Sequence, residues 1–233
     1  MSIELLSRVN WFARVEDETV LTRLGVRFGF LGKGHETFPC YHPKQVHGTN
    51  VVPANSATAP HSSERPEADA IYTQDSSLLI GVKSADCLPI LFCSENRTTV
   101  MALHGGWKGL KAGVLAQGIR SMREQSPGEA IFACIGPAIA HCHYEVGPEL
   151  VEMVQKLLKP EQAAYCLSRG AGDRWFLDLP TLGTFALINL ELRPEHISVF
   201  RSCTHCFPEK WHSFRRDASH SIRNWSWIQI PSV

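Results

Sequence analysis

Apolar residues along the chain follow two periods, and each period predicts a different kind of element. Short continuous apolar runs bounded by polar or turn residues are typical of buried strands. Apolar positions three and four residues apart are typical of a helix with one buried face. The runs predict strands at 77–82, 88–93, 98–103, 130–135, 174–178, 197–200 and 225–230, and the helical period predicts helices at 109–124, 147–159 and 178–192. Their irregular order favours an α+β fold, a mixed β-sheet covered by helices, over a strict parallel βαβ array.

Composition and charge narrow the class of protein. The 233 residues are long enough to bury a substantial core, and 44% hydrophobic with 20% charged residues is ordinary for a globular chain. Lys plus Arg and Asp plus Glu both number 23, so the basic excess of many nucleic-acid-binding proteins is lacking. The Pro- and Ser-rich segment 53–69 predicts a surface loop, because patterned segments of similar character resume on both sides.

The sequence also carries expectations about location. The first twenty residues lack the order of a signal peptide, and no run approaches the about 20 apolar residues of a membrane span. The eight cysteines have no framework spacing, which favours reduced thiols. We therefore expect a cytoplasmic protein that binds neither nucleic acid nor a membrane.

Residues 88–104 form the most informative segment. Two apolar runs flank the polar sequence SENR at 94–97, which predicts a β-hairpin. If the chain turns directly around 94–97, Cys87 faces His104. Directly opposed residues have Cβ atoms about 4.5–5.5 Å apart, and a one-residue shift leaves a diagonal pair within reach. One metal ion could then contact both the thiolate and the imidazole.

His47, in the sequence KQVHG, is a candidate third ligand. Two histidines and a cysteine that leave a fourth position open are typical of catalytic zinc. The alternatives are an accidental combination among 11 histidines and 8 cysteines, and a metal-free pair with Cys87 as nucleophile and His104 as base. A non-catalytic interaction protein would bind no metal there. Asp86 and Glu145 are candidates for proton transfer, and each could equally be structural.

Phosphate has two candidate binding segments. The glycines of GGWKG (105–109) let the chain turn into the next helix, whose first N–H groups and Lys108 could hold an anion, or the turn could serve packing alone. Arg215 and Arg216 form the second candidate. Neighbours in an extended chain point to opposite faces, so at most one of them is expected to face the site.

Two further patterns carry little weight. The sequence CTHC at 203–206 has metal-ligand spacing, but a single C-x-x-C without a partner pair is weak support for zinc. His141 and His143 form the chain's one His-x-His pair, so the full copper cluster of a laccase is not expected.

Five motifs together resemble one known family. KQVHG, SADCLPILF, HGGWKG, GPAI followed by CHYEVG, and SFRRD occur in this order between about residue 26 and the C-terminus. They are similar to those of the bacterial laccase-domain (YfiH-type) proteins, which are described as multicopper polyphenol oxidoreductases and as purine nucleoside phosphorylases. The family fold is a mixed α/β sandwich, distantly like the Cys–His deamidase domain of cytotoxic necrotizing toxins. The resemblance therefore implies a single domain over 1–233, shortened before residue 44.

The resemblance also implies a function. It predicts phosphorolysis of adenosine, inosine, guanosine and methylthioadenosine, and deamination of adenosine, with purine nucleosides and phosphate as partners. A zinc-bound water of lowered pKa would suit deamination. Alternatives are a metal-free Cys–His hydrolase and a copper-dependent polyphenol oxidase. We expect a monomer or a small homo-oligomer.

The site residues implied by the resemblance fall into three groups. The zinc ligands, with copper as an alternative metal, are His47, Cys87 and His104. The catalytic residues are Cys87, His104 and Asp86. The substrate-binding residues are Lys33, Gln45, Lys108, Arg215, Arg216 and Arg223. Three of these depart from the family pattern: Lys33 and Lys108 stand where arginine is usual, and Arg223 belongs to an altered ending, SIRNW.

Overall fold

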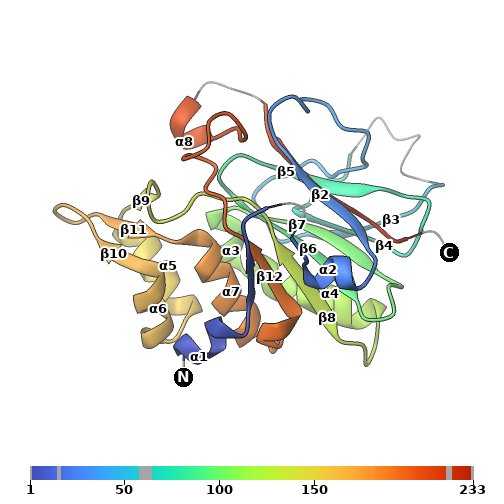
Figure 1. The fold of residues 1–233 in the computed structure, drawn as a ribbon, viewed down its shortest axis with the longest axis horizontal. Coiled ribbons are helices and arrows are strands. Elements are labelled where there is room, and N and C mark those ends of the chain that lie inside the picture. Colours follow the sequence, from blue (N-terminus) through green and yellow to red (C-terminus); the bar gives the residue numbers. More distant parts are fainter. Residues whose placement is uncertain (1, 15–16, 58–64, 219–221, 232–233) are drawn as a thin grey trace.

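The computed structural model describes the whole chain except residues 1, 15–16, 58–64, 219–221 and 232–233. Its centre is a seven-stranded mixed sheet (Figure 1). In order across this sheet the strands are β1 (Asn10–Phe12), β12 (Ile197–Phe200), β8 (Ile131–Ile135), β6 (Leu88–Ser94), β7 (Val100–Gly105), β4 (Ala70–Thr73) and β3 (Val51–Ala54). A second sheet consists of β2 (Arg27–Leu31), β13 (Asn224–Gln229) and β5 (Ile80–Ser84), and a third of β10 (Leu167–Arg169), β11 (Trp175–Leu177) and β9 (Glu145–Val146).

Eight α-helices occur in the described part of the chain. They are α1 (Ser2–Ser7), α2 (Val20–Arg23), α3 (Trp107–Ala112), α4 (Val114–Gln125), α5 (Pro148–Leu157), α6 (Pro160–Cys166), α7 (Leu179–Asn189) and α8 (Phe214–Asp217). A 3-10 turn, η1 (Pro194–His196), precedes β12. Among the residues that were placed, none of these helices combines the length and apolar character that crossing a membrane requires.

The central strands β6 and β7 are covered on both faces. Along β6, Leu88, Ile90 and Phe92 belong to the core shared with α3, α4, α5 and α7, whereas Leu91 and Cys93 belong to the core shared with β2, β5 and β13. Successive side chains of a strand point to opposite faces. The apolar runs of the sequence are continuous because these strands are buried between a helical layer and a second sheet (Figure 1).

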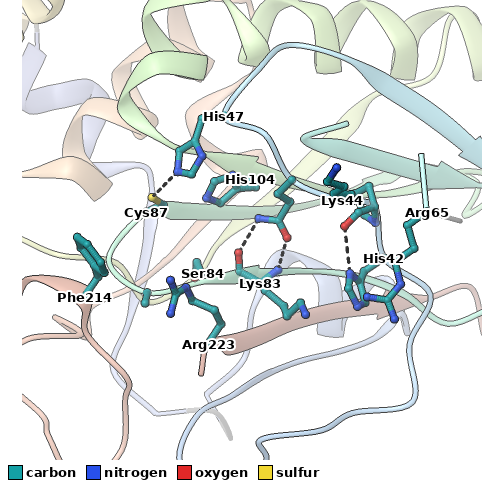
Figure 2. Close-up of a pocket in the computed structure, with 13 residues that line it drawn as sticks. His42, Lys44, His47, Arg65, Lys83, Ser84, Cys87, His104, Phe214 and Arg223 are labelled. Atoms are coloured by element: carbon teal, nitrogen blue, oxygen red, sulfur yellow. Dashed lines mark hydrogen bonds between the residues drawn. The ribbon is translucent and has the colours of Figure 1, made fainter. Parts of the chain in front are cut away.

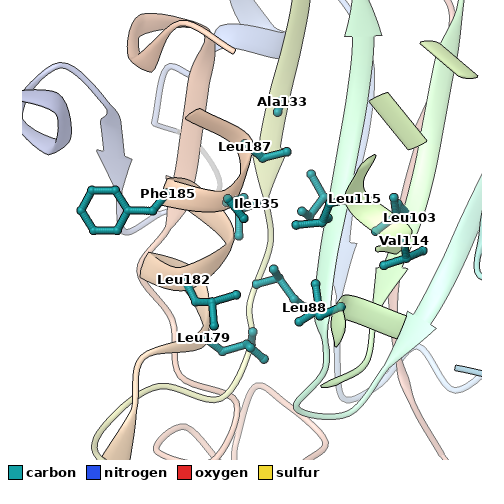
Figure 3. Packing of buried hydrophobic residues seen from close by; sticks show 14 of the residues in the cluster. Leu88, Leu103, Val114, Leu115, Ala133, Ile135, Leu179, Leu182, Phe185 and Leu187 are labelled. Carbon is teal, nitrogen blue, oxygen red and sulfur yellow. The ribbon is translucent and has the colours of Figure 1, made fainter. Parts of the chain in front are cut away.

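The helical side holds the larger core. Leu88 and Leu103 from the sheet meet Leu115 of α4 and Leu182 of α7, with Ile135 of β8 beside them (Figure 3). These side chains are almost completely buried. The helices thus fix the positions of β7, which carries His104 near its end, and of β6, which begins directly after Cys87.

The seven predicted strands are confirmed, with boundaries shifted by a few residues, and so is the α+β class with a mixed sheet. The single helix predicted at 109–124 is wrong. Gly113 lies at φ 96° and separates α3 from α4, and α3 begins earlier, at Trp107. This left-handed conformation costs glycine little because it has no Cβ.

The predicted register of the hairpin is also wrong. Pro89, and not Cys87, pairs with His104. The reason is the turn, which begins one residue later than expected: Ser94 donates its backbone N–H to Thr99, and its hydroxyl accepts the N–H groups of Thr98 and Thr99. Cys87 therefore precedes the paired part of β6 and lies diagonal to His104, which still leaves the two side chains within reach.

We expect Leu182→Ala to lower the free energy of unfolding by about 2–5 kcal/mol, because it removes a fully buried side chain of α7 and leaves a cavity in the helical core. Urea unfolding measures this. The control is Ile3→Ala, whose side chain is 65% exposed and which should change stability by less than about 0.5 kcal/mol. Equal effects of the two substitutions would contradict the assignment of the core.

Candidate functional site

A buried carboxylate, that of Asp69, organises the candidate site. It lies directly before β4 and accepts the backbone N–H groups of Val46, His47 and Gly48 at 3.2, 3.0 and 2.6 Å. The same carboxylate lies 2.8 Å from Nδ1 of His104, whose backbone N–H donates to the Asp69 carbonyl oxygen at 2.7 Å. Asp69 thereby positions both the loop that carries His47 and the ring of His104.

The expected proximity of His47, Cys87 and His104 is found. One donor atom from each lies within 4.8 Å of the others, and Nε2 of His47 is 4.0 Å from Sγ of Cys87. The two imidazole rings meet edge to face, with centroids 4.9 Å apart (Figure 2). Because Asp69 occupies Nδ1 of His104, Nε2 is the ring nitrogen left for a metal. Two nitrogens and one sulfur suit a zinc-type ion with an open position.

Backbone strain accompanies these side chains. His47 lies at φ 60° and Asp86, directly before Cys87, lies at φ 85°. Such left-handed conformations are uncommon for residues other than glycine and persist only where the surroundings hold them. The hydrogen bonds to Asp69 hold the backbone at His47, and the side-chain contacts of Asp86 described below hold the second position.

The glycines of GGWKG are explained by packing. A Cβ on Gly106 would overlap the ring of His47, and one on Gly109 would lie 2.8 Å from the carbonyl oxygen of Gly48. The start of α3 can therefore approach the loop of His47 closely. Lys108 is exposed beside the Trp107 ring, with Nζ 5.8 Å from its centroid, and it does not line the cavities next to the site.

The surroundings favour a charged Cys87. Burial by itself would raise the pKa of the Cys87 thiol, but hydrogen bonds from His104 and His47 and the charges of these rings lower it to about 6. Burial by itself would lower the pKa of His104, but the hydrogen bonds to Asp69 and Cys87 raise it to about 9. A thiolate is the form of cysteine that binds a metal or acts as a nucleophile.

Two cavities adjoin the site and share His47 and Cys87, whereas His104 lines only the first. The first, of about 740 Å³, contains the cationic side chains of Lys44, Arg65, Lys83 and Arg223, and the described residues that line it include no carboxylate (Figure 2). We call it the cationic cavity. Burial, followed by the positive charge of Arg65, lowers the pKa of Lys83, as expected for a partly buried lysine near other cations.

The second, of about 420 Å³, contains the rings of Trp107, Tyr144 and Phe214 and the carboxylates of Glu145 and Glu149. We call it the aromatic cavity. His47, Cys87 and Phe214 line both cavities.

Asp86 is placed beside the site with its carboxylate already engaged. It accepts from the hydroxyls of Thr204 and Ser213 at 2.6 and 3.1 Å and from the N–H of Arg215 at 2.6 Å. These contacts connect the loop of Cys87 to the segment around α8. The carboxylate of Glu145, the other candidate for proton transfer, lines the aromatic cavity.

The arginine pair is divided between two surroundings, as expected, although α8 is a helical turn and not an extended segment. Arg215 lines the aromatic cavity, with its guanidinium 5.2 Å from the Tyr144 ring centroid. Arg216 donates instead to the carbonyl oxygens of Thr204, His205 and Trp211, so it supports the loop that precedes α8.

The remaining predicted substrate residues are distributed as follows. Arg223 and Gln45 line the cationic cavity, where Gln45 exchanges two hydrogen bonds with the backbone of Lys83. Lys33 lies outside both cavities, and its backbone N–H donates to the carbonyl oxygen of Lys210. Sequence reasoning missed Asp69, Arg65 and Lys83. Asp69 ends the Pro- and Ser-rich segment and directly precedes β4, a strand of four residues that is too short to recognise from its pattern.

The mixed α+β fold and the three grouped donor side chains of His47, Cys87 and His104 agree with a match to one protein family. A family profile described as multi-copper polyphenol oxidoreductase laccase matches residues 13–231, and the chain belongs to this family.

Named relatives agree with this assignment. The chain is 36% identical over 174 residues to purine nucleoside phosphorylase YfiH of Escherichia coli (strain K12), an alignment that covers 75% of this chain and 67% of the relative. It is 28% identical over 192 residues to purine nucleoside phosphorylase YlmD of Geobacillus stearothermophilus, covering 79% and 70%. The crystal structure of YlmD from that organism superposes with a TM-score of 0.76 at 25% identity, covering 82% of this chain and 73% of the other.

We expect Asp69→Asn to weaken binding of a divalent ion roughly 10- to 100-fold, because the amide holds His104 less firmly in the tautomer and orientation that present Nε2. Isothermal titration with zinc measures the affinity. Asp75→Asn is a matched control, because the Asp75 carboxylate also accepts backbone N–H groups, from Ser56 and Ser77, in a loop outside the site. An unchanged affinity in Asp69→Asn would contradict the organising role of Asp69.

Proposed function

We propose that this protein is a zinc-dependent purine nucleoside phosphorylase, which cleaves adenosine, inosine, guanosine or methylthioadenosine with inorganic phosphate. The observation that carries the proposal is the position of His47 and Cys87 on the border between a cationic and an aromatic cavity. Phosphorolysis needs an anion and an apolar base side by side. The printed names of the relatives support the same activity.

Phosphate is assigned to the cationic cavity. Lys83, Arg65 and Arg223 supply positive charge within a concave surface, and phosphate oxygens form strong charge-assisted hydrogen bonds with such groups. The lowered pKa of Lys83 supports this assignment, since a bound anion would relieve the repulsion among these cations. This places phosphate away from Lys108 and from the start of α3.

The nucleoside is assigned to the aromatic cavity. Trp107 and Tyr144 are partly buried and Phe214 is more than half exposed, so each can offer ring surface to a purine. Glu145 and Glu149 supply carboxylates that can accept hydrogen bonds from hydroxyl or amino groups. Arg215, fixed by its bond to the Glu145 carbonyl oxygen and by the Tyr144 ring, closes one side.

Zinc is assigned to His47, Cys87 and His104. Three donors of this kind, with Asp69 behind one imidazole, are typical of a catalytic zinc site. When bound, such an ion polarises an oxygen and can lower the pKa of a bound water to about 7. That chemistry supports deamination of adenosine as a second reaction, and we assign proton transfer to Glu145, which lines the aromatic cavity. We assign Asp86 a positioning role, because its carboxylate is engaged by Thr204, Ser213 and Arg215.

A metal-free hydrolase is the second candidate. The order Asp69, His104, Cys87 resembles the carboxylate, base and nucleophile of cysteine hydrolases, and the lowered pKa of Cys87 suits a nucleophile. Copper-dependent oxidation of phenols is suggested by the description of the family, and a nitrogen and sulfur donor set also binds copper. Metal dependence and phosphate dependence separate these candidates from a zinc phosphorylase.

We expect Cys87→Ala to lose phosphate-dependent cleavage of inosine, because the substitution removes the thiolate of the proposed zinc site. Release of hypoxanthine with and without phosphate measures the reaction, and elemental analysis measures zinc in the same samples. Cys40→Ala is the control, since Cys40 is a free thiol outside both cavities.

Full activity of Cys87→Ala would overturn both the zinc and the cysteine-nucleophile proposals. Activity of the unsubstituted protein that survives complete removal of metal would favour the metal-free hydrolase. Cleavage that does not depend on phosphate would contradict phosphorolysis.

We expect Lys83→Gln to raise the KM for phosphate at least roughly tenfold, because hydrogen bonds to charged groups contribute about 1.5–3 kcal/mol. Steady-state kinetics with varied phosphate at saturating inosine measures the change. Lys108→Gln removes a lysine that lies outside both cavities and should leave this KM unchanged. A raised KM in Lys108→Gln together with an unchanged KM in Lys83→Gln would instead assign the phosphate to the start of α3.

A further inference from the structure

A second group of metal-ligand side chains lies apart from His47, Cys87 and His104. It consists of Cys142, His143, Cys203 and Cys206, and one donor atom from each lies within 4.8 Å of the others. We call it the Cys3His cluster. It shares no residue with the trio and is not needed for the proposed phosphorolysis.

The topology of the central sheet brings this cluster together. Strands β8 and β12 are parallel neighbours, so the loops that follow them leave the same edge of the sheet. Ala138 bridges to Cys203, and the N–H of Thr204 donates to the Ala138 carbonyl oxygen at 3.2 Å. The C-x-x-C pair at 203–206 thereby meets the adjacent Cys142 and His143, a partner pair that is distant in sequence.

The distances between donor atoms fit one shared ion. Sγ of Cys142 lies 3.5 Å from Sγ of Cys203 and 3.2 Å from Sγ of Cys206, and Sγ of Cys206 lies 3.2 Å from Nδ1 of His143. Zinc–sulfur bonds of about 2.3 Å in a tetrahedron place sulfur atoms about 3.8 Å apart. A disulfide would require about 2.05 Å. The observed spacing is nearer to the tetrahedral value.

We propose that the Cys3His cluster binds one zinc ion as a closed, structural site. Three cysteines and one histidine form a complete tetrahedral set that leaves no position for water or substrate. Three thiolates favour zinc over magnesium or calcium, which prefer oxygen ligands. Without a metal, the three thiols would be connected only by weak S–H hydrogen bonds, which zinc–sulfur bonds would replace.

The ion would fix the framework behind the aromatic cavity. Thr204, next to Cys203, donates to the carboxylate of Asp86, which precedes Cys87. Tyr144, next to His143, lines the cavity. The ion would thus tie two cavity-supporting loops together without contacting the substrate.

The test is a count of zinc sites with their ligands. The full-length protein, reduced and stripped of metal, is loaded with zinc alone and analysed by elemental analysis and native mass spectrometry. We expect two zinc ions per unsubstituted chain and one in either Cys87→Ala or Cys206→Ser. Cys40→Ala is the control and should keep two.

A second measurement does not depend on the folding of a cluster variant. Zinc X-ray absorption of Cys87→Ala, whose cluster is intact, should report three sulfur neighbours and one nitrogen neighbour. Full zinc retention in Cys206→Ser, or a Cys142–Cys206 disulfide in place of metal under reducing conditions, would overturn the proposal. Loss of zinc in Cys206→Ser but not in Cys87→Ala would support it while contradicting the proposed active site.

Discussion

The buried carboxylate of Asp69 is the contact on which the rest of the site depends. It accepts three backbone N–H groups of the loop at 46–48 and forms a 2.8 Å hydrogen bond with Nδ1 of His104. Without these partners a carboxylate that is completely excluded from water would be unfavourable by several kcal/mol. The Asp69 carboxylate therefore holds both the backbone at His47 and the ring of His104. Burial by itself would raise the pKa of Asp69, but the hydrogen bonds with His104 and with the N–H of Gly48 hold it below its usual range.

The two-sided core explains why such a site can be rigid. Strands β6 and β7 are packed between helices and a second sheet, so His104 at the end of β7 and Cys87 just before β6 have little freedom to separate. Gly106, directly before α3, and Gly109 within it then allow the loop of His47 to approach closely. His47, Cys87 and His104 come from three segments, and they lie close together because the packed helices and sheets hold these segments in place.

Much of this arrangement could be predicted from the sequence. Continuous apolar runs identified the buried strands. The predicted hairpin placed Cys87 close to His104, and although its predicted register was wrong, the two residues form a diagonal pair that is still close. Asp69 could not be predicted, since its role rests on backbone groups 21 to 23 positions away. The partners of the C-x-x-C pair at 203–206 were missed for the same reason, because only the adjacency of β8 and β12 brings them close.

The most direct test of the central claim is anomalous diffraction at the zinc edge from crystals of the protein grown with zinc. The account predicts an anomalous peak for a zinc ion that is bound by Nε2 of His47, Sγ of Cys87 and Nε2 of His104. The carboxylate of Asp69 should keep its hydrogen bond with Nδ1 of His104. An empty trio in zinc-saturated crystals, or a peak bound through Nδ1 of His104 with Asp69 displaced, would contradict it.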